Sequence, residues 1–255
     1  ASSGLRVLLT PALLQQLRSD YEVAAALCRK MGTSCKELRE TKEIYWASNG
    51  LVPADLTTLG KLCSVLPALE TLRLIEISGS ADPDGVQRLV EGLGVGALPA
   101  VTTLILNNMH MGDAGASALA ASLGRGALPR LKTLALCEDA ISDAGLVALA
   151  PALRRLPALE KLYLCRNPLG DQGLAALLAP PPPAGALPPP NGVLTKLKVL
   201  NLWHTQVADA GCATLADALY SAALPAFELL ELDCIPASAA SQAAVDEAMI
   251  RRITP

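Results

Sequence analysis

The sequence predicts an α/β solenoid, in which short parallel strands alternate with helices along most of the chain. Three observations point to this fold: a leucine pattern recurs at intervals of 28 to 38 residues, an Asp-x-Gly triplet follows four copies, and a Leu-Pro pair closes five. The best-formed copy runs from Leu156 to Leu178 as LPALEKLYLCRNPLGDQGLAALL. Its Leu-x-x-Leu-x-Leu-x-x-Asn-x-Leu segment predicts a strand and a turn, and its Leu- and Ala-rich remainder predicts a helix.

Seven copies align on their first core position, here called the anchor. The anchors are Thr41, Leu69, Val101, Leu131, Leu159, Leu197 and Phe227. The third and fifth residues after every anchor are apolar, as in Ile44 and Trp46 or Leu162 and Leu164. Because side chains alternate along a strand, these residues are expected in the core, and the second, fourth and sixth on the opposite face. Seven strands at about 4.8 Å spacing give a face roughly 30 Å long, which suffices for a protein interface.

The helical part of each unit also has a recurrent beginning and end. An aspartate at a helix start can accept hydrogen bonds from free N–H groups and suits the positive end of the helix dipole. The proline of each Leu-Pro pair is expected to stop the helix and to favour extended structure before it. The Asp-x-Gly triplets are Asp113/Gly115, Asp143/Gly145, Asp171/Gly173 and Asp209/Gly211.

Units of about 28 residues with a full helix and an Asp-x-Gly start resemble the ribonuclease-inhibitor-like class of leucine-rich repeats. The resemblance covers about residues 36–250. It implies a horseshoe-shaped solenoid with parallel strands on the concave face and helices on the convex face. The chain departs from the class at the asparagine position, so several turns are expected to use other hydrogen-bonding partners or water. That position holds Asn49, Ile77, Met109, Asp139, Asn167, Thr205 and Ile235.

The predicted organisation has three parts. Residues 1–35 are expected to form a helical N-terminal cap, residues 36–250 a leucine-rich-repeat solenoid of about seven repeats, and residues 251–255 a C-terminal tail. A proline-rich insertion, APPPPAGALPPPNG, occupies residues 179–192. Its composition favours polyproline II structure and predicts a surface loop, with a second contact to a partner protein as the alternative.

Composition disfavours several classes of protein. The net charge of −3 and a pI of about 5.5 argue against a nucleic-acid partner. No run of 18 apolar residues lacks prolines or charges, so no transmembrane segment is predicted. Seven scattered cysteines predict mostly reduced thiols in an intracellular, cytoplasmic protein. An organelle stays an alternative, because the chain begins Ala-Ser-Ser-Gly, as a processed or trimmed form would. No metal ligand set and no cofactor is expected.

Two cysteines share equivalent positions on neighbouring predicted strands. Cys137 and Cys165 each stand six residues after an anchor. Their backbones are expected about 5 Å apart, within disulfide range. Free thiols are the favoured expectation, and a redox or metal-binding pair is the alternative.

The candidate site is the predicted concave face. Only seven residues of the chain are aromatic, yet Tyr45, Tyr163 and Trp203 fall at outward strand positions. Exposed Trp and Tyr are typical hot spots of protein interfaces, although these side chains could instead pack on one another. The predicted partner-binding residues are Tyr45, Arg73, Ile75, Ile105, Asn107, Tyr163, Asn201 and Trp203.

These features favour a non-enzymatic protein–protein interaction module, as a scaffold or as a subunit of a larger assembly. The chain has no Gly-x-Ser-x-Gly, no phosphate-binding glycine loop and no recognisable Ser/His/Asp arrangement, so no catalytic residue is predicted. Two alternatives are kept. VAAALCRKMGTSCKELRE, with LTPALLQQL before it, is similar to a degenerate F-box that has Met31 and Gly32 where a tryptophan is usual, which implies a ubiquitin-ligase substrate receptor. The repeat class also occurs in Ran GTPase-activating proteins, although those carry an acidic tail and this chain ends Ile-Arg-Arg-Ile-Thr-Pro.

Overall fold

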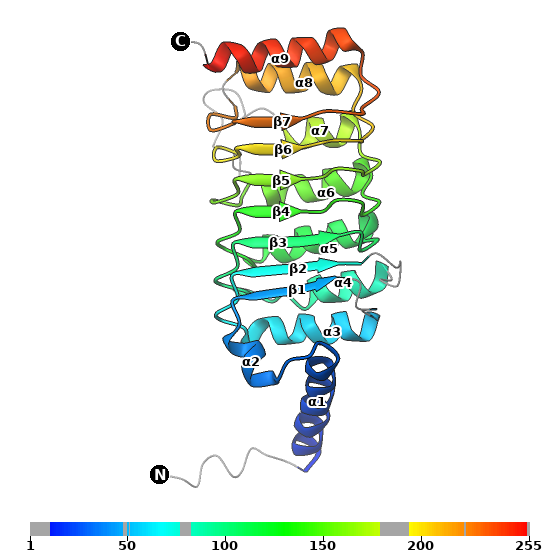
Figure 1. Cartoon of the computed structure of the whole chain (residues 1–255), viewed down its shortest axis with the longest axis vertical. Helices are drawn as coiled ribbons and strands as arrows, with labels where there is room; N and C mark the ends of the chain where they lie inside the picture. The colour runs from blue at the N-terminus through cyan, green and yellow to red at the C-terminus, as the bar shows by residue number, and fades with distance from the viewer. Residues whose placement is uncertain are drawn as a thin grey trace.

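After two N-terminal helices, strands and helices alternate along the described part of the chain (Figure 1). The computed structural model describes residues 11–47, 50, 52–76, 83–178, 194–221 and 223–253. The strands are β1 (Glu43–Ala47), β2 (Thr71–Ile75), β3 (Thr103–Asn107), β4 (Thr133–Ala135), β5 (Lys161–Tyr163), β6 (Val199–Asn201) and β7 (Leu229–Glu231). The helices are α1 (Pro11–Lys30), α2 (Cys35–Glu40), α3 (Pro53–Leu62), the short 3-10 helix η1 (Cys63–Val65), α4 (Pro83–Glu91), α5 (Gly112–Gly124), α6 (Asp143–Leu153), α7 (Asp171–Leu177), α8 (Asp209–Tyr220) and α9 (Ala239–Ile253).

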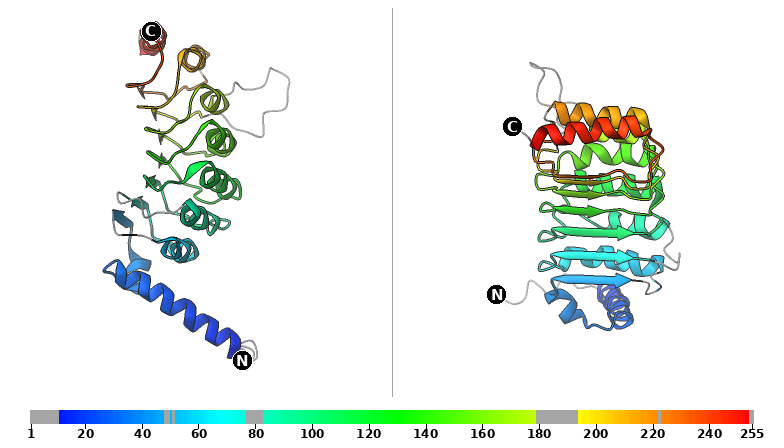
Figure 2. Two further views of the ribbon diagram at one scale, coloured as in Figure 1. Left: turned by 90° about the vertical axis from the view of Figure 1, so that its right-hand side faces the viewer. Right: turned by 45° about the horizontal axis from the view of Figure 1, so that its top comes forward.

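The strands form one parallel sheet in sequence order, β1 to β7. Its register places equivalent repeat positions opposite one another, so that Leu72 pairs with Leu104 and Leu104 with Leu134. The side view in Figure 2 shows the helices as an outer arc and the strands as an inner layer. This arrangement confirms the predicted α/β solenoid, with its strands on the concave face and its helices on the convex face.

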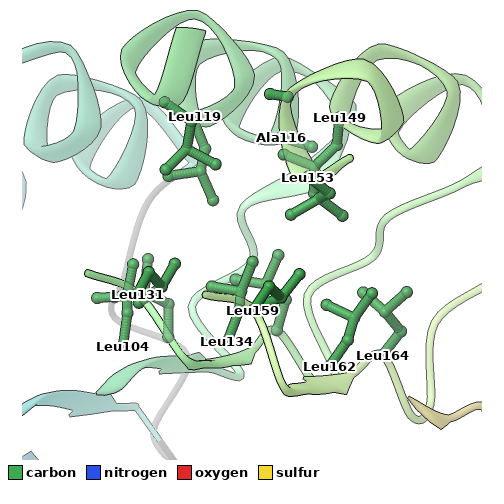
Figure 3. Close-up of a cluster of buried hydrophobic side chains, with 14 of the residues drawn as sticks. Leu104, Ala116, Leu119, Leu131, Leu134, Leu149, Leu153, Leu159, Leu162 and Leu164 are labelled. Atoms are coloured by element: carbon green, nitrogen blue, oxygen red, sulfur yellow. The ribbon is translucent and has the colours of Figure 1, made fainter. Parts of the chain in front are cut away.

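Stacked leucines fill the space between the sheet and the helices (Figure 3). Leu134, Leu162 and Leu164 have no exposed surface and face Leu149 and Leu153 of α6. Each such side chain contributes roughly 1.5–3 kcal/mol by leaving water. The third and fifth residues after the anchor are buried in the first six repeats, whereas Leu230 and Leu232 of the last repeat and the first anchor, Thr41, are partly buried. The core therefore runs without interruption through the solenoid and thins at its C-terminal end.

The aspartates of the Asp-x-Gly triplets cap the helix of the following repeat rather than their own. In three of the four, the carboxylate oxygen Oδ1 accepts two backbone N–H groups at the next helix start, and Asp209 accepts one, from Ser238 at 2.6 Å. Asp113 accepts from Ser142 (2.8 Å) and Gly145 (3.0 Å), Asp143 from Gly170 (2.7 Å) and Gly173 (2.8 Å), and Asp171 from Ala208 (2.8 Å) and Gly211 (2.9 Å). The sequence predicted that these aspartates cap helices. Which helix each one caps depends on how neighbouring helices stack. From α5 to α9, capping therefore links one repeat to the next.

The glycine of the triplet provides room for this contact. A Cβ added to Gly173 would lie 2.8 Å from Asp143 Oδ1 and 3.1 Å from Leu146 Cβ. A side chain here would therefore push the preceding aspartate away from the two N–H groups that it accepts.

The Leu-Pro pairs have a different role from the one predicted. Helix α5 ends at Gly124, before Leu128 and Pro129 are reached. The Leu131 N–H then donates to the Leu128 carbonyl at 3.1 Å, which closes a β-turn with proline in its second position. Leu98 and Val101 form the same turn at 3.2 Å. The prolines thus direct the chain into the next strand. They do not end the helices, which stop before each Leu-Pro pair is reached.

The turns after the strands use several different side chains. Asn167 is buried, accepts from the Ile141 N–H at 3.0 Å and donates to the Leu136 carbonyl at 2.6 Å. In the preceding turn Asp139 takes the asparagine's place and accepts from the Met109 N–H at 2.7 Å. Burial raises the pKa of Asp139 to about 8, so its neutral form predominates at neutral pH. In this turn an aspartate replaces asparagine as the hydrogen-bond acceptor, as expected for turns that lack asparagine.

The N-terminal helices differ in how much of them packs on the solenoid. Among the side chains of α1 that the structure describes, the buried ones, Ala24, Leu27 and Cys28, lie in its last turns, and the helix extends away from the stack (Figure 1). A capping box of Ser34 and Glu37 starts α2. At the other end, residues 251–253, expected in a tail, continue α9. Asn49, Ile77 and the proline-rich segment 179–192 lie outside the described residues. Within the described ranges, no helix has the length and hydrophobicity to cross a membrane.

We expect Gly173→Ala to lower the free energy of unfolding by about 2–3 kcal/mol, because its Cβ would displace Asp143 from the α7 start. Urea denaturation measures the change. Gly124→Ala is the matched control, since a Cβ there meets nothing within 4 Å and helix propensity favours alanine. Equal stability of the two variants would contradict the capping role.

We expect Asp139→Asn to flatten the pH dependence of stability. The folded-state pKa of about 8 exceeds the usual value of 3.8, so the native chain holds a proton that the unfolded chain releases. This contribution is complete below about pH 4 and declines as pH rises to about 8, by on the order of a few kcal/mol. Urea denaturation between pH 4.5 and 8.5 should show a smaller decline in the variant. Parallel curves for the two proteins would contradict the assignment.

Candidate functional site

The concave face is built from three rows of side chains, one for each outward position of the strands. Strand register aligns the middle row across the whole sheet. This row holds Tyr45, Arg73, Ile105, Ala135, Tyr163, Asn201 and Glu231, so it contains five of the eight predicted partner-binding residues. The sheet therefore places residues up to 186 positions apart in sequence along a single line.

The three other predicted residues lie in the row toward the strand ends. Ile75 pairs directly with Asn107 across β2 and β3. Trp203 follows β6 in a turn, five strands of the sheet away from β1. The eight residues thus share one face but form two groups, one at β1 to β3 and one at β5 and β6.

The first group is the more exposed. Tyr45 is 58% exposed, although it stands in a regular strand between the buried Ile44 and Trp46. Arg73 pairs with Glu43 at 3.6 Å, and Ile75 and Ile105 are partly exposed beside it. An aromatic ring, two aliphatic side chains and a guanidinium therefore meet solvent together.

The second group is held by contacts that the strand pattern did not predict. The Arg166 guanidinium lies 4.5 Å from the centre of the Trp203 ring, and its Nη1 pairs with Glu138 Oε1 at 2.7 Å. Arg166 and Glu138 occupy equivalent turn positions with positive φ, one residue beyond the outward positions considered from sequence. The sequence signal for this ion pair was the opposite charge of two residues that stand 28 positions apart, one repeat from each other. The stack fixes the indole orientation on the concave side of the turns.

The two asparagines of the predicted site also stabilise their surroundings. Asn107 Oδ1 accepts from the Cys137 N–H at 3.0 Å, and Asn201 Oδ1 accepts from the Trp203 N–H at 2.9 Å. The Asn201 amide also donates to the Glu231 carboxylate. These hydrogen bonds order the turns that follow β4 and β6.

The expectation of free thiols at Cys137 and Cys165 is wrong, because the structure joins them in a disulfide. Parallel pairing of β4 and β5 brings their Cα atoms to 4.8 Å, and both side chains leave the sheet on the same side. The bond joins the segments that follow β4 and β5, in the row that also holds Asn107 and Trp203. The cysteines that stay free are Cys28, Cys35, Cys63, Cys212 and Cys234.

The chemistry of this face suits binding. It combines aromatic rings, aliphatic side chains and side chains whose charges are already paired on a rigid sheet. In the part of the chain that the structure describes, no three His, Cys, Asp or Glu side chains come together as a metal site.

Comparison with protein-family models and with curated proteins finds no match. Solved structures do resemble the chain. Actin-binding site 2 of leiomodin-1 aligns with a TM-score of 0.46 at 17% identity, over 67% of this chain and 88% of that one. The C-terminal domain of Caenorhabditis elegans tropomodulin gives 0.45 at 18%, over 68% and 93%. TLR13, from its complex with ssRNA13, gives 0.45 at 19%, over 80% and 24%. These TM-scores and identities assign neither function nor partner to this chain.

We expect alanine at both Cys137 and Cys165 to lower the free energy of unfolding by about 3 kcal/mol, since the disulfide closes a 28-residue separation. Urea denaturation with and without dithiothreitol checks this. The wild type should lose stability on reduction, whereas the double variant should not respond. The control is Cys234→Ala, which removes an exposed free thiol. A wild type that is indifferent to dithiothreitol would contradict the prediction.

Proposed function

We propose that this protein is a non-enzymatic interaction module of the ribonuclease-inhibitor-like leucine-rich-repeat class, which binds a protein partner through its concave face. The observation that carries the proposal is the line of exposed and half-exposed Tyr45, Ile105 and Tyr163, with Trp203 beside it, on one rigid sheet. Aromatic side chains at outward sheet positions contribute nothing to the leucine core, and such residues dominate the binding energy of protein interfaces.

The size and rigidity of the face support a folded partner. Seven strands span roughly 30 Å, which matches the surface that a standard interface covers on each partner. Backbone pairing fixes the strands, and the Arg166 stack fixes the Trp203 ring. A partner therefore meets side chains that are already ordered, which limits the entropy lost on association.

The proposal has several finer parts. The protein acts as a scaffold or as a subunit of a larger assembly, without catalysis, in an intracellular compartment. Residues 179–192 provide a second contact with the partner. The F-box alternative requires adaptor binding through residues 1–46, and the GTPase-regulator alternative requires binding of a small GTPase. Both stay separate hypotheses.

We expect Tyr163→Ala combined with Trp203→Ala to weaken partner binding by at least about 2 kcal/mol, or roughly 30-fold, if both side chains are hot spots. The measurement begins with cross-linking mass spectrometry on the protein from its native source, which identifies the protein linked to Lys161 on the concave face. Titration of that protein against wild type and variant then gives the two affinities.

Tyr220→Ala is the matched control, because this tyrosine is 52% exposed on helix α8 of the opposite layer. It should bind as the wild type does. Equal affinity of the wild type and the double variant, with folding intact, would place the interface away from the concave face. Cross-links to a ubiquitin-ligase adaptor from Lys30, Lys36 and Lys42 would favour the F-box alternative.

A further inference from the structure

Strand β7 leaves one edge of the sheet unpaired by any described strand. It is last in the order β1 to β7, and Figure 1 shows it at the end of the sheet. The Leu229 N–H donates to the Lys198 carbonyl, and the Glu231 and Asp233 carbonyls accept from the N–H groups of Leu202 and His204 after β6, each at 2.9 Å. Because successive residues turn their backbone groups to opposite sides, those of Leu230 and Leu232 face away from β6.

A groove of about 290 Å³ follows this edge between β7 and α9. Residues 228–233 form one wall, and Gln242, Asp246 and Met249 of α9 form the other. Leu230, Leu232 and Met249 are partly buried here, whereas their counterparts in β6, Leu200 and Leu202, have no exposed surface. The groove therefore offers an apolar floor next to outward-facing backbone donors and acceptors.

The ion pairs between neighbouring repeats indicate which charge a segment bound at this edge would carry. The residue after each anchor forms a row along the start of the strands, in which lysine and glutamate alternate in most repeats. Its ion pairs are Lys42–Glu70 (2.9 Å), Lys132–Glu160 (3.7 Å), Lys198–Glu160 (3.6 Å) and Lys198–Glu228 (3.8 Å). Glu160 lies between two lysines. Glu228, at the edge, pairs with Lys198 on its inner side, and its outer side faces the groove.

The other charges of the groove have the same sign. Glu231, Asp233 and Asp246 also line it, and among the described residues no lysine or arginine does. We propose that the open edge of β7 binds an extended, lysine-bearing segment of a partner protein, which pairs its backbone with Leu230 and Leu232 and places lysines against Glu228 and Asp246. This surface is separate from the concave-face interface. A second copy of this chain fits less well, because twofold pairing of β7 would oppose like carboxylates.

The chain itself supplies a probe. Residues 195–203, TKLKVLNLW, contain β6 and the residues before it. In the native solenoid this segment pairs with β5, and its Lys198 lies against Glu160. We would titrate fluorescein-labelled TKLKVLNLW with the full chain at about 50 mM salt and follow fluorescence anisotropy. The matched control peptide is TELEVLNLW, which keeps the strand and reverses its charge. We expect at least tenfold tighter binding of the lysine peptide, and a loss of affinity as salt rises.

Variants of the protein locate the binding. Glu228→Lys should weaken TKLKVLNLW about tenfold, and Leu230→Pro should weaken it similarly by removing an outward N–H that β6 does not use. Circular dichroism and urea denaturation verify that both variants fold. The combined Tyr163→Ala and Trp203→Ala variant should bind the peptide as the wild type does, so failure of one proposal leaves the other standing.

Three results would overturn the inference. They are equal affinity for the two peptides, unchanged affinity of the folded Glu228→Lys variant, and sedimentation of the free protein as a dimer that Glu228→Lys disrupts. Absence of binding by TKLKVLNLW counts as the first of these, since neither peptide would then be preferred.

Discussion

The contact between each aspartate and the start of the next helix is the interaction on which the solenoid depends. Asp113, Asp143 and Asp171 each accept two N–H groups from the following repeat, and Asp209 accepts from Ser238 before α9. Helix starts have N–H groups without intrahelical partners, so some acceptor is required there. Supplying it from the neighbouring repeat fixes the spacing and rotation between helices, and the leucines of the core can then stack in register with the strands.

Because each repeat is stabilised by its neighbours, the repeats at the two ends of the described solenoid are covered less completely. An internal repeat covers its core with a repeat on each side, whereas a terminal repeat has one neighbour. At the N-terminus, α2 and the last turns of α1 supply part of the missing cover. At the C-terminus, α9 does so with Val245 and Ala248, and Leu230 and Leu232 stay partly buried. Repeat geometry therefore makes the C-terminal edge a natural place for a further strand.

The concave face depends on the same regularity in a different way. Parallel register places every outward side chain in one of three rows, whatever its neighbours in sequence. A side chain there can change without disturbing the leucine core behind it, so the face can carry aromatic residues, ion pairs and a disulfide. This separation of core and face is the physical reason why a repeat fold can support specific recognition.

The sequence by itself determined the strand positions, the core residues and the rows of the concave face, because each follows from a local period that the chain repeats seven times. It also identified the aspartates as caps. Only the tertiary structure decided which helix each aspartate caps, that Cys137 and Cys165 are joined, and that Arg166 covers Trp203. Those contacts link residues 27 to 40 positions apart, across neighbouring repeats. Their geometry is set by the stacking angle and by turn residues with positive φ, which no local period specifies.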